Sequence, residues 1–352
     1  MGKSVLVCMS GGVDSTVAAL LLERQGFDVA GLTFWFWSFE KAPEFGGKTK
    51  CCSLDSAGLA ARELGIPHEV VDASLLFQRL VLDDFVARRR RGETPNPCGR
   101  CNRLVRFGLA LEYARQHGID YIATGHHARI TTDGGNPCLL RGADPQKDQT
   151  YFLYGLGEDV LSHLLFPVGA LPKAEVFALA RAAHLTAAAL PESQDLCFAR
   201  GDDVSFLFDP EDYRPGPILD SGGREIGQHR GLPRYTIGQR RGLGIASPVP
   251  LYVIDLDPDR NALVVGEESR LLRDALVATD AIYAAGRMPP DGTMLEAKIR
   301  YRSPTSEARF EPTSAQAFRL TFRTPQRAIT PGQLAVFYER DRLLGGGTIS
   351  DS

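Results

Sequence analysis

The stretch that decides the fold is Ser10-Gly11-Gly12-Val13-Asp14-Ser15, which lies between an apolar run, Ser4–Met9, and a helical pattern, Thr16–Gln25. The apolar run is typical of a buried strand. Two glycines let a backbone fold closely around an anion, and the amide groups of a helix N-terminus add positive potential. The sequence therefore predicts a phosphate-binding loop. The alternative is an ordinary strand-to-helix turn whose Ser and Asp side chains cap the helix.

The same alternation of strand and helix patterns continues through the first two hundred residues. Further strands are predicted at Asp28–Phe34, His68–Asp72 and Asp120–Thr124, and further helices at Leu54–Leu64 and Arg103–His117. This order is typical of an α/β domain with an open parallel sheet and helices on both faces. Ligands of such domains bind at the carboxyl ends of the strands.

The sequence changes character after about residue 205, where Gly and Pro become frequent and helical periodicity is nearly absent. Short strands are predicted at Leu251–Leu256, Ala262–Val265, Leu295–Tyr301, Ala317–Phe322 and Gln333–Tyr338. This pattern favours a small β-rich module followed by a β-barrel. We therefore expect three domains, at residues 1–205, 206–270 and 271–352.

Composition excludes several classes of protein. Of the 352 residues, 43% are hydrophobic and 24% are charged, which is unlike disordered, collagen-like or coiled-coil chains. A net charge of −3 argues against a protein coated in positive charge, but it allows local basic surfaces. Neither a signal peptide nor an apolar stretch long enough for a membrane helix is found. We expect a cytoplasmic monomer that does not bind membranes.

The seven cysteines are an odd number in a chain without an export signal, which favours thiol or metal chemistry over a disulfide scaffold. Cys8 and Cys138 are most simply explained as buried apolar side chains. Cys101 and Cys197 lie in polar segments and are candidates for reactive thiols. The adjacent pair Cys51-Cys52 is compatible with packing or with redox chemistry.

In this context the first motif resembles that of the PP-loop ATP pyrophosphatases, which adenylate a substrate and release pyrophosphate. Other segments resemble the bacterial tRNA-specific 2-thiouridylases. These are Thr94-Pro95-Asn96-Pro97 with Cys101-Asn102, Ala123-Thr124-Gly125-His126, Lys147-Asp148-Gln149-Thr150-Tyr151-Phe152, Glu192-Ser193-Gln194-Asp195-Leu196-Cys197-Phe198 and Thr236-Ile237-Gly238-Gln239-Arg240-Arg241-Gly242-Leu243-Gly244. The matches follow the family's order over nearly the whole chain.

The resemblance implies ATP-dependent 2-thiolation of the wobble uridine of tRNA. ATP, with magnesium, adenylates the C2 oxygen and so makes it a good leaving group, after which a nucleophilic sulfur replaces it. Cys197 is implied to carry that sulfur as a persulfide, and Cys101 is implied to be the catalytic partner that forms a transient disulfide with it. A sulfur-donor protein, such as a cysteine desulfurase or a relay protein, is an implied partner.

The resemblance also implies binding residues. For ATP they are Cys8, Met9, Ser10, Gly11, Gly12, Val13, Asp14, Ser15, Phe34 and Gly125. For tRNA they are Asn96, Pro97, Cys98, His126, Lys147, Asp148, Gln149, Arg300, Tyr301 and Gln333. Three basic tracts add candidate phosphate contacts: Arg88–Arg91 with Arg100, Arg103 and Arg106; Arg224–Arg241; and Lys298, Arg300, Arg302 and Arg309.

Two positions depart from the family pattern. Many relatives have Asp where this chain has Cys98, so a Cys98 thiolate replaces the acid, or else Cys98, Cys101 and Cys197 hold a [4Fe-4S] cluster. A zinc site is less favoured, because no second pair of ligands has the usual spacing. Phe34 stands where relatives usually have Met, so a backbone contact to adenine is expected to be retained there.

Two other classes of protein remain as alternatives. A different PP-loop adenylating enzyme, such as a small-molecule synthetase, would not need the Cys101 and Cys197 pair or the β-rich C-terminal half. A tRNA-binding protein without catalytic activity would not need an intact phosphate-binding loop. Both features together favour the thiolating enzyme.

Overall fold

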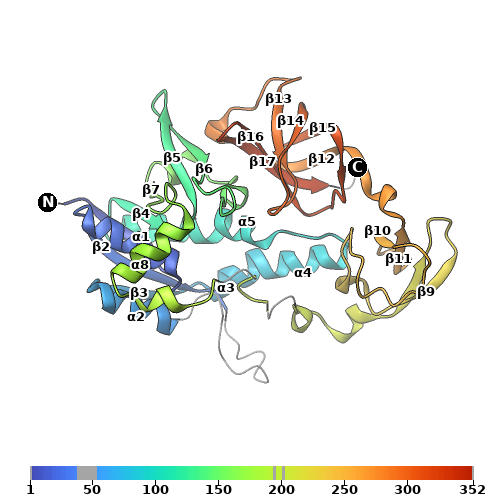
Figure 1. Cartoon of the computed structure of the whole chain (residues 1–352), viewed down its shortest axis with the longest axis horizontal. Helices are drawn as coiled ribbons and strands as arrows, with labels where there is room; N and C mark the ends of the chain where they lie inside the picture. The colour runs from blue at the N-terminus through green and yellow to red at the C-terminus, as the bar shows by residue number, and fades with distance from the viewer. Residues whose placement is uncertain (1, 38–53, 193–195, 200–202, 351–352) are drawn as a thin grey trace.

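The computed structural model describes residues 2–37, 54–192, 196–199 and 203–350. Cys51-Cys52 and the Ser193-Gln194-Asp195 part of the Cys197 motif lie outside these residues. Figure 1 shows the arrangement: the N-terminal α/β unit, a long helical segment leading away from it, a small β-rich unit and a barrel. The predicted fold class is confirmed in all three parts.

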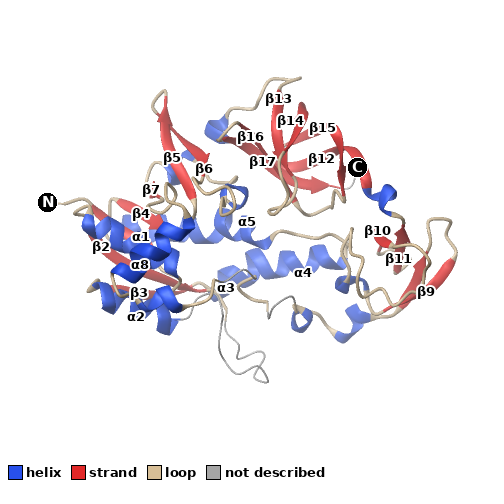
Figure 2. Ribbon diagram, viewed as in Figure 1, coloured by secondary structure: helices blue, strands red, loops and turns tan. Residues whose placement is uncertain are grey.

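The first unit is built on a parallel sheet with the strand order β3-β2-β1-β4-β7 (Figure 2). Its strands are β1 (Ser4–Cys8), β2 (Asp28–Trp35), β3 (His68–Asp72), β4 (Tyr121–Thr124) and β7 (Leu164–Leu165). The first four match the sequence predictions to within a residue at each end. All neighbouring pairs are parallel, so their carboxyl ends share one edge of the sheet.

Helices cover both faces of this sheet. They are α1 (Val13–Arg24), α2 (Leu54–Leu64), α6 (Phe107–Gln116), α7 (Glu158–Leu161) and α8 (Lys173–Ala182). Val5 and Val7 of β1 pack with α1 and α2, whereas Leu6, on the opposite face, packs in a cluster with α6. Both faces of β1 are therefore buried, which explains its continuous apolar sequence.

A long helical segment connects the first unit to the others. It comprises α3 (Ser74–Phe77), a π-helical turn at Gln78–Leu82 and α4 (Asp83–Arg90). Figure 1 shows α4 running from the parallel sheet toward the small β-rich unit. Arg89 donates hydrogen bonds to the Pro233 carbonyl and to Thr236 Oγ1, and Arg90 pairs with Asp212 at 2.7 Å. These contacts hold the small unit against α4.

The C-terminal half is β-rich, as predicted. The small unit has the strand order β10-β11-β8-β9, with β8 (Gly216–Leu219), β9 (Glu225–His229), β10 (Tyr252–Asp257) and β11 (Ala262–Gly266). The barrel has the order β12-β15-β14-β13-β16-β17 and is closed by pairing of β12 with β17. Its strands are β12 (Leu272–Tyr283), β13 (Met294–Lys298), β14 (Ser306–Ser314), β15 (Ala317–Arg327), β16 (Leu334–Glu339) and β17 (Arg342–Ser350).

A hairpin of the first unit continues the barrel sheet. It is formed by β5 (Ala128–Asp133) and β6 (Asn136–Arg141), and Leu140 of β6 pairs with Arg342 of β17. Ion pairs from Arg129 to Asp341 and from Arg342 to Asp133 lie beside this junction. The first unit and the barrel therefore share one sheet. The domain boundaries at 205 and 270 stay predictions.

The helix predicted at Arg103–His117 begins six residues earlier. Helix α5 (Pro97–Cys101) continues without a break through a π-helical turn at Asn102–Arg106 into α6. Asn96 Oδ1 accepts a hydrogen bond from the Gly99 amide at 3.1 Å and caps α5. Short 3-10 turns occur at Thr150–Phe152, Thr186–Ala189, Ser205–Leu207, Pro210–Tyr213, Leu232–Arg234, Glu268–Leu271 and Ala284–Gly286.

Candidate functional site

A cleft of about 1590 Å³ lies where the parallel sheet, α4, α5 and the barrel meet. Most of the residues implied by the family resemblance line it. They are Ser10, Gly11, Gly12, Val13, Asp14, Asn96, Pro97, Cys98, Cys101, His126, Lys147, Asp148, Gln149, Cys197, Tyr301 and Gln333. The structure thus brings together segments that are more than 300 residues apart in the sequence.

The remaining candidates do not line the cleft. Cys8, Met9 and Phe34 are buried in the core beneath it, and Ser15 lies in the first turn of α1 behind the loop. Burial raises the pKa of Cys8 to about 11, so this thiol stays protonated at neutral pH. Any part that Cys8 and Phe34 play in ATP binding is therefore through the shape of the core or through their backbone.

The loop before α1 has the geometry of an anion site. Gly12 is the N-cap of α1, and among the described residues no side-chain hydrogen bond caps the first turn. The Ser10 and Ser15 hydroxyls lie 3.2 Å apart, and the Ser15 hydroxyl donates to the Gly12 carbonyl. Asp14 does not cap the helix either, because its carboxylate binds Lys173. The first-turn amides are thus left for a ligand, which fits a phosphate group.

Two glycines are required by close contacts. Gly11 has φ +78°, and a Cβ atom there would lie 2.6 Å from Ser56 Cβ. A Cβ atom on Gly125, which follows β4, would lie 2.5 Å from backbone atoms of Asp14 and Ser15. Gly125 therefore supports the phosphate-binding loop from behind, consistent with its place in the predicted ATP site.

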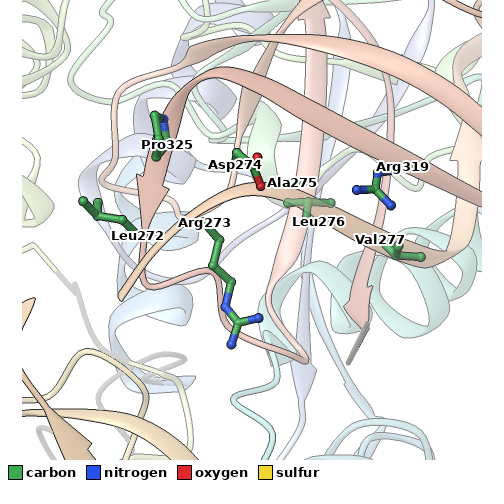
Figure 3. A pocket seen from close by; sticks show the side chains of 8 residues that line it. All are labelled: Leu272, Arg273, Asp274, Ala275, Leu276, Val277, Arg319 and Pro325. Atoms are coloured by element: carbon green, nitrogen blue, oxygen red, sulfur yellow. The ribbon is translucent and has the colours of Figure 1, made fainter. Parts of the chain in front are cut away.

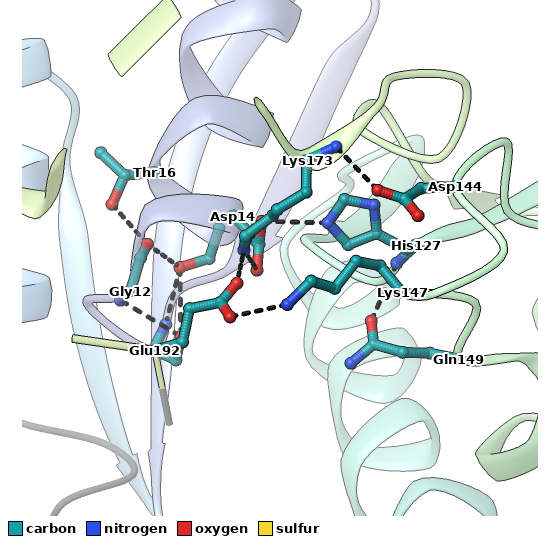
Figure 4. A network of polar contacts seen from close by, with 11 residues as sticks. Gly12, Asp14, Thr16, His127, Asp144, Lys147, Gln149, Lys173 and Glu192 are labelled. Carbon is teal, nitrogen blue, oxygen red and sulfur yellow. Dashed lines mark hydrogen bonds and ion pairs between the residues drawn. The ribbon is translucent and has the colours of Figure 1, made fainter. Parts of the chain in front are cut away.

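Four charged side chains form a chain of ion pairs across the cleft (Figure 4). Lys173 Nζ lies 2.6 Å from Asp14 Oδ2, 2.7 Å from Asp14 Oδ1 and 2.7 Å from Glu192 Oε1. Glu192 Oε2 in turn lies 2.7 Å from Lys147 Nζ. We call Asp14, Lys173, Glu192 and Lys147 the charge ladder.

The ladder sets the ionisation of its carboxylates. Burial is the largest effect on Asp14 and favours its neutral form, but the hydrogen bond from His127 and the charge of Lys173 outweigh it and lower the pKa of Asp14. Burial likewise opposes ionisation of Glu192, while Lys147 and Lys173 lower the pKa of that carboxyl. Both acids are therefore ionised at neutral pH.

Sequence reasoning missed two members of this network. Lys173 is the first residue of α8, and His127, whose Nε2 lies 3.1 Å from Asp14 Oδ1, follows the predicted His126. A positive charge in the first turn of a helix is unfavourable next to the positive end of the helix dipole. A lysine at this position therefore indicates a nearby anionic partner, and the sequence could have revealed Lys173 in this way. The His127 Nδ1 atom is buried and has no hydrogen-bond partner among the described residues.

Cys98 and Cys101 lie about one helical turn apart, and both belong to α5. Cys98 is the second residue of the helix and Cys101 is the fifth. Because the helix begins at Pro97 and not at Arg103, its first turn contains Cys98 rather than Cys101. Arg100, between the two cysteines, pairs with Asp84 at 3.4 Å.

Cys98, Cys101 and Cys197 line the same cleft. Within the described ranges, which include all three, no group of three His, Cys, Asp or Glu side chains is arranged to hold a metal ion. Neither the cluster nor the zinc site that the sequence left open is found among the described residues.

His126 presents a neutral ring to the cleft. Its Nδ1 lies 2.8 Å from Thr124 Oγ1, and its ring packs on Phe107 with 5.8 Å between centroids. Burial, with a smaller contribution from Arg106, lowers the pKa of His126 to about 3. The ring is therefore suited to stacking or to a neutral hydrogen bond rather than to binding a phosphate by charge.

The barrel supplies the opposite wall of the cleft. The Tyr301 ring packs on Phe152 with 4.5 Å between centroids, and Gln333 Nε2 donates to the Thr94 carbonyl at 2.9 Å. Arg300 instead donates to the carbonyls of Ile237 and Ala328, at 3.2 and 2.8 Å, and joins the small unit to the barrel. Its predicted tRNA contact stays a prediction.

Much of the predicted basic surface around α4 is engaged within the protein. Arg88 pairs with Asp84 and Glu93, and Arg90 pairs with Asp209 and Asp212. Arg240 and Arg241, in contrast, are exposed, and in the described part of the chain no ion pair is found for either. They are the better placed candidates for RNA phosphates.

A second hollow, of about 430 Å³, lies on the outside of the barrel (Figure 3). It is lined by Leu272, Arg273, Asp274, Ala275, Leu276, Val277, Arg319 and Pro325. None of the predicted site residues is among them.

The described residues contain no helix that is long and apolar enough to cross a membrane.

Comparisons with known proteins cover the whole chain. A family described as the tRNA methyl transferase HUP domain matches residues 3–201, and the corresponding PRC-barrel domain matches residues 205–267. A family described as the aminomethyltransferase beta-barrel domain matches residues 273–349. Among solved structures, a 4-thiouridine synthetase–RNA complex with bound ATP aligns with a TM-score of 0.37 and 17% identity, over 56% of this chain and 44% of that one.

Curated relatives are far more similar. The tRNA-specific 2-thiouridylase MnmA of Symbiobacterium thermophilum is 47% identical, over 99% of this chain and 92% of the relative. MnmA of Moorella thermoacetica is also 47% identical, over 98% of both chains, and that of Roseiflexus castenholzii is 45% identical, over 98% and 99%. This similarity extends through the phosphate-binding loop, the cysteine-lined cleft and the barrel, and the chain belongs to the family of tRNA-specific 2-thiouridylases.

Proposed function

We propose that the protein uses ATP to replace the C2 oxygen of a wobble uridine in tRNA by sulfur. The observation that carries this proposal is the single cleft in which an uncapped helix N-terminus and two candidate reactive thiols, Cys101 and Cys197, face the same space. A phosphate-binding loop alone would serve many adenylating enzymes. Thiols at the same site favour one that transfers sulfur.

In the first step the uridine C2 oxygen attacks the α-phosphorus of ATP and pyrophosphate leaves. The first-turn amides of α1 would hold the phosphates. Asp14 is a carboxylate at the mouth of this loop and suits Mg²⁺, which proteins usually bind through one or two carboxylates together with substrate phosphates. Mg²⁺ would offset the charge that develops on the departing pyrophosphate.

In the second step sulfur replaces the adenylated oxygen. A donor protein loads Cys197 with sulfur to give a persulfide. The Cys101 thiolate then attacks the inner sulfur of that persulfide, so a Cys101–Cys197 disulfide forms and hydrosulfide is released. Hydrosulfide attacks C2 of the activated uridine and AMP leaves with the former C2 oxygen. A thiol reductant from outside the protein returns the disulfide to two thiols.

Residues that line the cleft would position the base. Tyr301 and the neutral ring of His126 offer flat surfaces on which an unstacked base can pack. Asn96 and Pro97 fix the start of α5 and with it the place of Cys98. The exposed Arg240 and Arg241 would contact phosphates outside the cleft.

The test is a reaction of the purified protein with tRNA, MgATP and a persulfide-loaded donor. We expect 2-thiouridine at the wobble position, with AMP and pyrophosphate formed in equal amounts. A tRNA with cytidine at that position is the matched control and should give no thiolated product. Pyrophosphate release that does not depend on a wobble uridine would overturn the proposal.

A further inference from the structure

The charge ladder extends from the ATP loop to the segment that is predicted to contact tRNA. Its ends are Asp14, in the first turn of α1, and Lys147, beside Gln149, which accepts a hydrogen bond from the His127 amide. All four members line the cleft. The ladder is therefore a continuous polar contact between the two predicted substrate sites (Figure 4).

Both central members of the ladder are shared between partners. An ammonium group has three N–H donors, and Lys173 Nζ makes three short contacts, two with Asp14 and one with Glu192. Glu192 places one oxygen on each lysine, at 2.7 Å in both cases. A stronger interaction with one partner therefore comes at the expense of the other.

The two lysines of the ladder differ in exposure. The Lys147 side chain is 32% exposed, whereas that of Lys173 is 9% exposed. An RNA phosphate entering the cleft therefore reaches Lys147 first and competes with Glu192 for it. Lys173 remains shielded from solvent and from salt. The strengths of its ion pairs with Asp14 and with Glu192 therefore change when phosphate competes with Glu192 for Lys147.

We propose that Glu192 is a positioning residue that couples binding of an RNA phosphate at Lys147 to release of Asp14 at the ATP loop. This inference rests on the proposed function. When phosphate takes Lys147, Glu192 binds Lys173 more strongly and Lys173 binds Asp14 less strongly. Asp14 then becomes available to the Mg²⁺ of MgATP. Its carboxylate still keeps one hydrogen-bond partner in the protein, His127 Nε2 at 3.1 Å.

Such coupling has a thermodynamic signature. If tRNA binding favours MgATP, then MgATP favours tRNA binding by the same factor. The factor is obtained as the ratio of two dissociation constants for tRNA, one measured without nucleotide and one with Mg²⁺ and an ATP analogue that cannot be cleaved between the α and β phosphates. A merely structural role of Glu192 would lower stability or both affinities without changing this ratio.

The experiment compares the wild type, Glu192→Gln and a control, Asp159→Asn. Asp159 pairs with Arg115 on the exposed surface, outside the cleft, so its variant also removes one carboxylate charge. We expect the analogue to tighten tRNA binding about fivefold or more in the wild type and in the control, which is the usual range for coupled sites. In Glu192→Gln the ratio should fall to within about twofold of one.

A double variant distinguishes loss of coupling from misfolding and tests whether Lys147 and Glu192 act in sequence. In a Lys147→Met background, Glu192→Gln should cause no further change in the ratio, because the two residues act in series. A wild-type ratio near one, or an unchanged ratio in Glu192→Gln, would overturn the inference while leaving the proposed function intact. Failure of the wild type to bind tRNA at all would overturn the proposed function and this inference with it.

Discussion

Gly125 has no room for a side chain, because the first turn of α1 lies directly against it. A Cβ atom would lie 2.5 Å from Asp14 C and Ser15 N. We predict that Gly125→Ala shifts the phosphate-binding loop, raises the KM for ATP at least about tenfold and lowers the free energy of unfolding by about 1–3 kcal/mol. Pyrophosphate-release kinetics and urea unfolding measure the two effects.

Gly108→Ala is the matched control for Gly125→Ala. Gly108 lies within α6, and a Cβ atom there would meet nothing within 4 Å. Gly108→Ala should leave the KM for ATP unchanged and raise the free energy of unfolding by about 0.5–1 kcal/mol, because Ala has a higher helix propensity than Gly. Equal effects of the two substitutions would contradict the assigned role of Gly125.

The lowered pKa of Asp14 predicts how its contribution to stability depends on pH. Burial, the largest single effect, raises this pKa, but His127 and Lys173 together lower it below the ordinary value of 3.8. An acid whose pKa is lower in the folded state stabilises the fold above its unfolded pKa and loses that contribution as the pH falls through the folded value. The stability difference between wild type and Asp14→Asn should be constant at about pH 5 to 7 and shrink below about pH 4. A difference that grows on acidification would be inconsistent with this ionic network.

Cys98 occupies a place where a carboxylate would also be stable. It lies in the first turn of α5, and negative charge is favoured near a helix N-terminus. We predict that Cys98→Asp retains formation of 2-thiouridine in protein that contains no iron. Loss of activity in this variant, beside an active wild type that carries iron, would instead favour a cluster held by three cysteines.

At the scale of residues, the sequence singled out the loop before α1 and the cysteines that line the cleft because each lies in a short local motif. Lys173 and His127 were missed for a physical reason. Their importance comes from contacts with Asp14 across more than 100 residues of sequence. Such contacts depend on how strands and helices pack and leave little local pattern.

At the scale of elements, α4 connects the first unit to the small β-rich unit. Arg89 is largely buried and donates to Pro233 and Thr236 of the small unit. We predict that Arg89→Ala weakens the docking of that unit, because two acceptors lose their donor. Hydrogen exchange should speed up at Leu232–Arg234 and remain unchanged in β1.

Arg91→Ala is the control for the bridging helix. Arg91 is 59% exposed, and Glu93 is its ion-pair partner in the described part of the chain. Exposed pairs contribute little to stability, so this variant should exchange like the wild type. If Arg89→Ala also behaves like the wild type, the contacts of α4 do not hold the small unit in place.

Strands β1, β2 and β4 of the parallel sheet were predicted well because each is a short, largely buried apolar run. Helix α4 was missed because its sequence, Asp83–Arg90, is mostly charged and has no apolar stripe. Hairpin β5–β6 was missed for a related reason. Its strands alternate weakly, and the pairing of Leu140 with Arg342 depends on a barrel that is formed 200 residues later.

At the scale of the whole molecule, the first unit and the barrel share one apolar cluster. Tyr151 and Leu139 of the first unit pack in the same cluster as Leu334, Val336 and Tyr338 of the barrel, and Tyr151 donates a hydrogen bond to the Leu334 carbonyl at 3.0 Å. The cleft is therefore a product of the assembled chain. Sequence patterns within each domain predicted the parts, but not the surface that they form together.

The central claim is that one cleft carries out adenylation and sulfur transfer with different residues. The most direct test measures pyrophosphate release and 2-thiouridine formation in the same reactions of Cys197→Ser and Asp14→Ala. Cys197→Ser should release pyrophosphate, in the presence of tRNA, within about threefold of the wild-type rate and form no 2-thiouridine, because adenylation precedes use of the thiol. Asp14→Ala should lose both products. Normal thiolation by Cys197→Ser, or loss of pyrophosphate release in that variant alone, would contradict the account.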